Sequence, residues 1–234
     1  MYHKLRLVLV INVYISKKIN NMGSILIAST GRSGSTFVNN ILNHLNIKSQ
    51  HEIRVNKHDI NDIDKNLSFC GWKFIWFDSL DRFDNILHQV RNPLDTIASA
   101  MTHDNILFDQ LFSFMLSKND PYFNKCYCKL LELPHTLYKM IYRSMIYWYF
   151  LNIHIESITS NIYKVETLND INGFKQFCKM INYNDIVTDE QFSEISKLFK
   201  RERIHIDVTF DLLNKLDPHL TSLIKTKALD YGYK

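Results

Sequence analysis

Residues 24–36 read SILIASTGRSGST and are followed by FVNNILNHL. Residues 24–28 form a short apolar run typical of a strand buried on both faces, and residues 36–45 repeat apolar side chains at helical spacing. Gly31 and Gly34 interrupt the pattern between these two segments. The stretch therefore predicts a strand, a glycine-containing turn and a helix, which is the opening unit of a wound α/β fold.

The predicted turn opens a helix, so its backbone N–H groups and the positive end of the helix dipole face whatever lies outside. Arg32 adds a fixed positive charge and a guanidinium fork that can bind an oxyanion through two hydrogen bonds. Three hydroxyl donors accompany it, from Ser33, Ser35 and Thr36. We expect phosphate or sulfate to bind here, with a plain strand-to-helix turn capped by hydroxyls as the alternative.

The rest of the chain continues the alternation of short apolar runs and longer helical periods. Residues 102–134 mix aromatic and turn residues without a clean period, which predicts short helices joined by loops. The expected fold is α/β, with a mostly parallel sheet of about five strands between helices in three layers. Further strands are predicted at residues 47–52, 72–77, 86–90 and 161–165, and helices at residues 94–101, 136–157, 171–180, 189–199 and 218–231.

One domain is expected over residues 23–234, because no repeat or long Pro/Gly linker divides the chain. Residues 1–22 are expected to form an N-terminal extension: an extra strand, a loosely ordered segment, or sequence ahead of a true start at Met22. Its apolar run, residues 5–15, is far shorter than the roughly 20 residues that a bilayer-spanning helix needs. A cytoplasmic protein is therefore expected, with a membrane anchor or the secretory pathway as the alternative through this run.

Charge and cysteine content narrow the class of ligand. The chain has 28 basic and 24 acidic residues, a net charge of +4 and a pI near 8.7. This balance suits a small anionic ligand and is too even for a nucleic-acid surface. The four cysteines show no CxxC pairing or histidines at zinc spacing, and no acidic cluster has magnesium-ligand spacing, so no metal site is expected.

A second motif, VRNPLD at residues 90–95, places Arg91 at the end of a predicted strand, and Pro93 is well suited to open the next helix. Ser99 then lies two turns into that helix. For Arg91 alone, a surface ion pair is the alternative to a ligand site at the strand end. Because ligands of parallel sheets bind at the carboxyl ends of the strands, we expect Arg91 and the loop at residues 31–36 to share a crevice.

Together, residues 31–36 and 90–99 resemble the donor-binding motifs of the sulfotransferase superfamily, whose members transfer a sulfuryl group from 3'-phosphoadenosine-5'-phosphosulfate (PAPS) and release PAP. In that family the first motif binds the 5'-phosphosulfate, and a strand-end arginine with a serine eight residues later binds the 3'-phosphate; Arg91 and Ser99 match these positions. The resemblance implies a P-loop nucleotide-kinase-like architecture, PAPS as donor, no metal, and an acceptor hydroxyl or amine on a carbohydrate, phenol or peptide. The donor-binding residues that it implies are Gly31, Arg32, Ser33, Gly34, Ser35, Thr36, Arg91 and Ser99.

Further segments extend the resemblance. Residues 163–168, YKVETL, look like the family's late strand ending in an acidic residue, and residues 229–233, LDYGY, look like its closing segment. Glu166 is expected to cap or brace the helix that follows it rather than act in catalysis. Trp148 and Asn152 fit a family pattern on one helix face, which a buried aromatic stripe explains as well.

The chain departs from related motifs in two places. Only Arg32 and Ser33 separate the two glycines and no lysine follows Gly34, so the loop is not a Walker A motif. The family's glycine-rich C-terminal donor segment is absent in clear form. Arg203, within residues 201–205, is the candidate replacement, and a solvated charge run is the alternative.

The transfer chemistry needs a general base and cations near the leaving group. Arg32 supplies one cation, and Lys73 resembles a lysine that some family members place beside the transferred group, with a strand-edge lysine reaching solvent as the alternative. Glu52 is the expected base, because some branches of the family carry a His-Glu pair or a lone Glu at this strand end. Its pKa is expected to be lowered by Arg32 and Lys73. His51 is the second candidate base, with a surface histidine as its alternative.

These residues predict an enzyme, a PAPS-dependent sulfotransferase that acts by in-line transfer. A catalytically silent protein that binds PAP or another nucleotide is one alternative, and a divergent P-loop kinase is the other. Neither nucleic acid nor a membrane is an expected partner.

Overall fold

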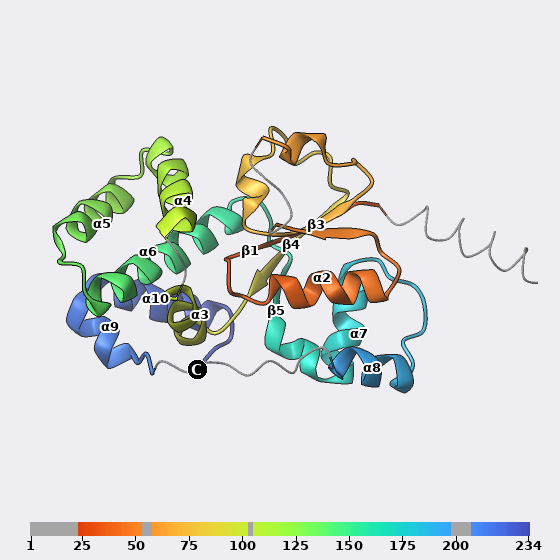
Figure 1. Ribbon diagram of the computed structural model, residues 1–234. Coiled ribbons are helices and arrows are strands. Elements are labelled where there is room, and N and C mark those ends of the chain that lie inside the picture. The colour runs from red at the N-terminus through yellow and green to blue at the C-terminus, as the bar shows by residue number, and fades with distance from the viewer. Residues whose placement is uncertain (1–22, 53–57, 103–104, 198–206) are drawn as a thin grey trace, which may run out of the picture.

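The computed structural model describes residues 23–52, 58–102, 105–197 and 207–234 of the 234-residue chain (Figure 1). A five-stranded sheet forms the centre, and every described strand pair is parallel, in the order β2-β3-β1-β4-β5. Helices cover both faces of the sheet, which confirms the predicted three-layer α/β fold. The strands are β1 (Ile25–Ser29), β2 (Ser49–His51), β3 (Ser68–Gly71), β4 (Asn85–Val90) and β5 (Ile162–Lys164).

The strands alternate with α-helices and short 3-10 helices, and the chain from β1 to α2 has the predicted strand-turn-helix form. The α-helices are α2 (Ser35–His44), α3 (Pro93–Ala100), α4 (Asn105–Ser117), α5 (Pro121–Glu132), α6 (Leu137–Glu156), α7 (Ile171–Met180), α8 (Asp189–Ser196), α9 (Phe210–Leu216) and α10 (Pro218–Asp230). The 3-10 helices are η2 (Ile60–Asp62), η3 (Lys73–Trp76) and η4 (Val165–Asn169).

β1 lies in the middle of the sheet and supplies side chains to two cores. Ile25 and Ile27 pack in a core with α2, α7 and α8, while Leu26 and Ala28 pack in a core with α3, α6 and α10. These two groups of helices lie on opposite sides of the sheet in Figure 1. Because successive strand residues point to opposite faces, a central strand between two helical layers requires the unbroken apolar run that β1 has.

Most described α-helices begin at a side-chain cap. At the start of α3, Asn92 Oδ1 accepts hydrogen bonds from the N–H groups of Leu94 and Asp95 (3.0 and 3.3 Å), and Pro93 occupies the first position as predicted. Helix α2 differs, because it begins at Gly34, whose φ of 97° lies in the left-handed region, and none of the described side chains caps it. No described side chain therefore caps the first backbone N–H groups of α2, and together with the positive end of the helix dipole these groups favour binding of an anion.

The predicted third strand at residues 72–77 is wrong. The strand is β3, Ser68–Gly71, and Lys73–Trp76 form the 3-10 helix η3. β3 ends at Gly71, whose φ of 138° is an angle that residues with side chains rarely adopt. Lys73 therefore lies just beyond the carboxyl end of β3 rather than on a strand.

Residues 102–134 hold two helices, α4 and α5, that are longer than the predicted short ones. Asn119, with φ of 54°, lies in the turn between them, and Asp120 caps α5 by accepting a hydrogen bond from Phe123 N–H (2.8 Å). Phe112 packs edge-on against Phe123, with ring centroids 5.7 Å apart. The mixture of aromatic and polar residues hides the helical period of this segment, and α9 is also missing from the prediction.

Two predicted features lie outside the described residues. These are the N-terminal extension, residues 1–22, with its apolar run, and Arg203, which lies within residues 198–206. Among the residues that the structure describes, no helix is both long enough and apolar enough to cross a bilayer.

Candidate functional site

The connections of the sheet change direction between β1 and β4. From β1 the chain runs through α2 to β2 on one side, and from β4 it runs through α3 and α6 to β5 on the other. Ligands of open parallel sheets bind outside the carboxyl ends of the strands at such a point. Arg32 follows β1 and Arg91 follows β4, so the topology places both residues there.

The two motifs predicted from the sequence contact each other at this position. Arg32 Nε donates a hydrogen bond to Ser99 Oγ on α3 (2.9 Å), and Arg91 Nη1 donates one to the backbone oxygen of Arg32 (2.8 Å). Arg32 is exposed and has a φ of 71°. Arg32, in the loop after β1, therefore contacts both Arg91 at the end of β4 and Ser99 on α3.

Arg91 is buried, unlike the surface residue given as its alternative. Its side chain is only 9% exposed and lies 3.5 Å from Asp95 Oδ2, so the ion pair is not the surface pair given as the alternative. Ser99 Oγ accepts a hydrogen bond from Arg32 Nε, and the convergence of Ser99 and Arg91 on one phosphate stays a prediction. Arg91 supports the backbone of the loop, and this contact keeps its guanidinium beside the loop.

Ser33 shapes the loop from within. It is buried, and both its N–H (3.2 Å) and its hydroxyl donate hydrogen bonds to Thr30 O. Gln89 on β4 donates a hydrogen bond to Ser33 O (2.7 Å) and accepts one from the hydroxyl of Tyr163 (2.7 Å). The hydroxyl of Ser33, expected as a donor to an anion, thus donates inside the loop instead.

The start of α2 is joined to the end of β2. Ser35 Oγ and Thr36 Oγ1 lie 2.9 and 3.2 Å from His51 Nε2. His51 is buried, so the alternative of a surface histidine is wrong. These contacts place one candidate base directly beside the predicted anion site.

Glu52 is the next residue and is buried against β3. Its Oε2 accepts a hydrogen bond from Trp72 N–H and packs against Gly71, while Oε1 lies 3.9 Å from His51 Nε2. Burial raises the pKa of Glu52 to about 8, although the N–H groups of Trp72 and Lys73 and the charge of Lys73 favour the ionised form. The predicted lowering of this pKa is wrong, because desolvation outweighs the nearby charge. Glu52 therefore ionises only as the pH rises through about 8.

Lys73 on η3 accompanies Glu52. It is half-buried, and its Nζ lies 5.5 Å from the ring centroid of Trp76. Burial lowers the pKa of Lys73, while the proximity of Glu52 raises it. The alternative of a strand-edge lysine is wrong, because residue 73 lies in a 3-10 helix at the end of the strand that lines the site.

Tyr147, on α6, is a site residue that the sequence analysis missed. It is fully buried, and its hydroxyl lies against the backbone of Gly31. A Cβ added to Gly31 would lie 2.5 Å from this hydroxyl oxygen and 3.3 Å from Trp72 Cδ1. Tyr147 therefore packs against the inner side of the loop at Gly31. In the sequence, it cannot be distinguished from the other aromatic residues of a buried helix.

Gly31→Ala tests this close approach. The added methyl group would overlap the Tyr147 hydroxyl, so we expect a loss of about 1–3 kcal/mol in the free energy of unfolding, measured in urea. Tyr147→Phe removes the oxygen, so the double variant should recover part of this loss relative to the Tyr147→Phe single variant. Equal stability of Gly31→Ala and the wild type would contradict the packing described here.

Trp148 and Asn152 have a structural role. Asn152 Nδ2 donates a hydrogen bond to Trp148 O (2.7 Å), and Asn152 Oδ1 lies 2.9 Å from Nε2 of His88, which is buried on β4. Trp148 is itself buried and packs edge-on against Tyr231. The pair ties α6 to the strand that carries Arg91, which agrees with the explanation by a buried aromatic stripe.

Glu166 braces a different helix from the expected one. Its Oε1 accepts a hydrogen bond from Asn92 N–H (2.9 Å) and its Oε2 accepts one from the hydroxyl of Tyr233 (2.8 Å). The helix that follows, α7, is capped by Asp170 instead. Glu166 therefore fixes the start of α3, directly after Arg91, and joins it to the C-terminal segment.

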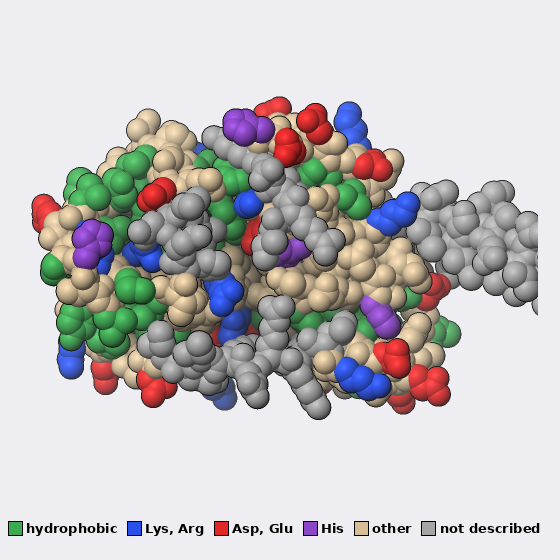
Figure 2. Space-filling model, viewed as in Figure 1, with side chains coloured by type: hydrophobic (Ala, Val, Ile, Leu, Met, Phe, Trp, Pro, Cys, Tyr) green, Lys and Arg blue, Asp and Glu red, His purple; other side chains and the backbone are tan. Residues whose placement is uncertain are grey.

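Four of the predicted site residues follow strand ends at the same edge of the sheet. β1 is followed by Arg32, and β4 is followed by Arg91. In the same way, β2 is followed by Glu52 and β3 by Lys73, and Ser99 on α3 contacts Arg32. Figure 2 shows basic, acidic and histidine side chains gathered near the centre of one face, between α2 and α6. No group of three His, Cys, Asp or Glu side chains suited to a metal ion occurs in the described part of the chain. Comparisons of the chain with protein-family models, with curated proteins and with solved structures gave no match.

Proposed function

We propose that the protein is a PAPS-dependent sulfotransferase. The observation that supports this most is the contact between the two motifs at the β1 and β4 ends, where Arg32 Nε lies 2.9 Å from Ser99 Oγ and Arg91 holds the Arg32 carbonyl. Two guanidinium groups beside an uncapped helix start favour a ligand with more than one anionic group. PAPS is such a ligand, because it carries a 3'-phosphate as well as the 5'-phosphosulfate.

The residues present fit this donor. Gly31 keeps the loop backbone free of side-chain atoms where a Cβ would collide with Tyr147, and α2 begins at the left-handed Gly34 without a side-chain cap from the described residues. In the proposal, Arg32 and the start of α2 hold the 5'-phosphosulfate, and Arg91 with Ser99 holds the 3'-phosphate. When bound, PAPS supplies the sulfuryl group: the acceptor oxygen bonds to sulfur while the bond from sulfur to the 5'-phosphate oxygen breaks, and its electron pair leaves with PAP.

The chain's own groups contribute position, charge and a base. Arg32 neutralises negative charge on the donor side, and Lys73 does so from η3. Glu52 accepts the acceptor's proton once it is ionised, which favours activity as the pH rises through about 8. His51, which contacts Ser35 and Thr36, lies between this base and the loop.

The catalytically silent alternative is favoured by one observation. The Glu52 carboxyl accepts a hydrogen bond from Trp72 N–H and lies against Gly71, and a buried acid held in this way can serve packing alone. Radiolabelled PAPS with carbohydrate, phenolic and peptide acceptors decides between the two. Sulfated product is the expected result, whereas tight binding of PAP without any product would favour the silent protein. Magnesium-dependent ATP turnover would favour the divergent kinase instead.

Arg91→Ala is expected to weaken PAP binding by about ten- to a hundredfold, because a charged hydrogen-bond donor is lost and the Arg32 carbonyl loses its partner. Isothermal titration calorimetry measures this affinity directly. Lys215→Ala, an exposed change on α9, is the matched control and should bind PAP as the wild type does. Equal affinity of Arg91→Ala and the wild type would reject the placement of the 3'-phosphate.

A further inference from the structure

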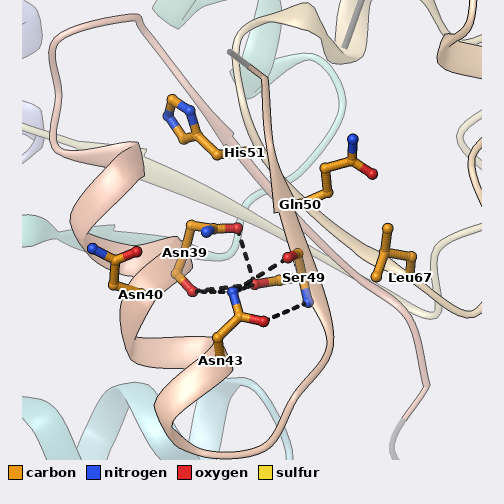
Figure 3. A pocket seen from close by; sticks show the side chains of 7 residues that line it. All are labelled: Asn39, Asn40, Asn43, Ser49, Gln50, His51 and Leu67. Atoms are coloured by element: carbon orange, nitrogen blue, oxygen red, sulfur yellow. Dashed lines mark hydrogen bonds between the residues drawn. The ribbon is translucent and has the colours of Figure 1, made fainter. Parts of the chain in front are cut away.

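A pocket of about 360 Å³ lies beside the edge strand β2, next to the site described above. Figure 3 shows its residues: three asparagines come from α2, and the β2 residues lie opposite them, with His51 at one end. This volume is within the range of pockets that hold small organic ligands. The lining residues are Asn39, Asn40, Asn43, Ser49, Gln50, His51 and Leu67.

One wall of the pocket is built by hydrogen bonds among its own residues. Asn43 Nδ2 donates to Ser49 Oγ (2.9 Å), Ser49 N–H donates to Asn43 Oδ1 (3.3 Å), and Ser49 Oγ lies 3.0 Å from Asn39 Oδ1 (Figure 3). These contacts join α2 to the start of β2. The wall is therefore fixed before any ligand binds, which lowers the cost of ordering the site.

Two amide groups of the pocket make no hydrogen bond to other described residues. They belong to Asn40 and Gln50, and each offers two N–H donors and a carbonyl acceptor. Among the lining residues that the structure describes, Leu67 is the single apolar side chain, and none is Lys, Arg, Asp or Glu. The chemistry of this lining is thus neutral and suited to groups that both donate and accept hydrogen bonds.

The pocket and the proposed transfer site share His51. This residue lines the pocket, its Nε2 lies 2.9 Å from Ser35 Oγ at the start of α2, and it lies 3.9 Å from Glu52 Oε1. A molecule held in the pocket therefore lies next to the candidate base and the proposed donor loop. An acceptor bound in the pocket would reach the proposed transfer site at the His51 end.

We propose that the pocket binds the acceptor and that the acceptor is a neutral carbohydrate; this inference rests on the proposed sulfotransferase function. A phenol would need an apolar or aromatic lining, which one leucine does not provide. A charged peptide would need charged side chains in the lining, and the described part of the lining offers none. Sugar hydroxyls both donate and accept, as the free amides do, and sites built to pair hydroxyls discriminate strongly for them.

The test uses the full chain and radiolabelled PAPS with three acceptors: N-acetyllactosamine, p-nitrophenol and a tyrosine-containing peptide. We expect sulfated N-acetyllactosamine and no product from the other two. In the double variant Asn40→Leu/Gln50→Leu, the KM for N-acetyllactosamine should rise by about tenfold, while the affinity for PAP stays within about twofold of the wild type. Gln110→Leu, an exposed amide change on α4, is the control and should alter neither value.

Two results would overturn the inference and leave the proposed function standing. One is sulfation of the phenol or the peptide in preference to the sugar. The other is an unchanged KM for N-acetyllactosamine in a double variant that unfolds at the wild-type temperature. Failure of the wild type to bind PAP in calorimetry would instead contradict the proposed function, and this inference with it.

Discussion

Arg32→Ala is expected to lower the rate of sulfuryl transfer by about 100- to 1,000-fold while the protein keeps its fold. Arg32 is exposed and its side chain contacts Ser99 rather than the core, so its removal costs little packing. The guanidinium of Arg32 is, however, the side-chain charge within the loop at residues 31–36. Losing it removes a cation from the place where negative charge develops on the donor.

Arg32→Lys and Ser99→Ala separate the two parts of this effect. Lysine retains the charge but lacks the planar fork, so we expect an intermediate rate. Ser99→Ala removes the partner of Arg32 Nε and should cost less than the loss of the arginine. Rates measured with saturating PAPS, together with melting temperatures, give the comparison. An Arg32→Ala protein with the wild-type rate would rule out the proposed role of the loop.

Glu52→Gln is the other change with a large expected effect, and it should act in opposite directions on activity and stability. Without a base, transfer should fall by about 100- to 10,000-fold. The protein should nevertheless become more stable at pH 9, because the wild type must then keep an ionised carboxylate in a buried position. Such opposite changes are expected where a functional group is held at a cost to the fold.

The pH dependence follows from the raised pKa of Glu52. The folded protein keeps the Glu52 proton up to about pH 8, whereas the unfolded chain loses it near the ordinary value of 4.5. Between these two values the folded state binds more protons, so the stability contributed by Glu52 falls as the pH rises. Glu52→Gln cannot lose this proton, so its advantage over the wild type should be small at pH 4 and reach a few kcal/mol at pH 9.

Thermal unfolding at pH 4, 7 and 9 measures this difference, and kcat/KM over the same range should rise towards pH 8 in the wild type. Glu132→Gln, an exposed change on α5, is the control and should alter neither profile. A Glu52→Gln variant that retains full activity would exclude Glu52 as the base. A variant less stable than the wild type at every pH would contradict the buried, protonated state described here.

The parts of the fold that local sequence decides were predicted correctly. Neighbouring residues alone predict strand β1, the turn with Gly31 and Gly34, and helix α2. They also predict that α3 begins at Pro93. Residues 72–77 show the limit of this reasoning. Their aromatic run has the composition of a strand, but the left-handed Gly71 ends β3 first, and a short apolar run does not reveal that angle.

The site depends on contacts between distant segments, which explains why its electrostatics were harder to predict. Motifs predict Arg32, Arg91 and Glu52 as site residues, but the direction of the Glu52 pKa follows from burial that only the assembled sheet reveals. Tyr147 reaches Gly31 from α6, more than a hundred residues along the chain. No local pattern distinguishes such a residue from an ordinary core aromatic.

The most direct test of the central claim compares two ligands in calorimetric titration of the wild-type protein. PAP and adenosine 5'-phosphate differ only by the 3'-phosphate, for which Arg91 and Ser99 are the proposed partners. We predict that PAP binds at least about tenfold more tightly than adenosine 5'-phosphate, and that Arg91→Ala removes most of this difference. PAP binding no tighter than adenosine 5'-phosphate, or weaker than ATP with magnesium, would contradict the assignment of this site to PAPS.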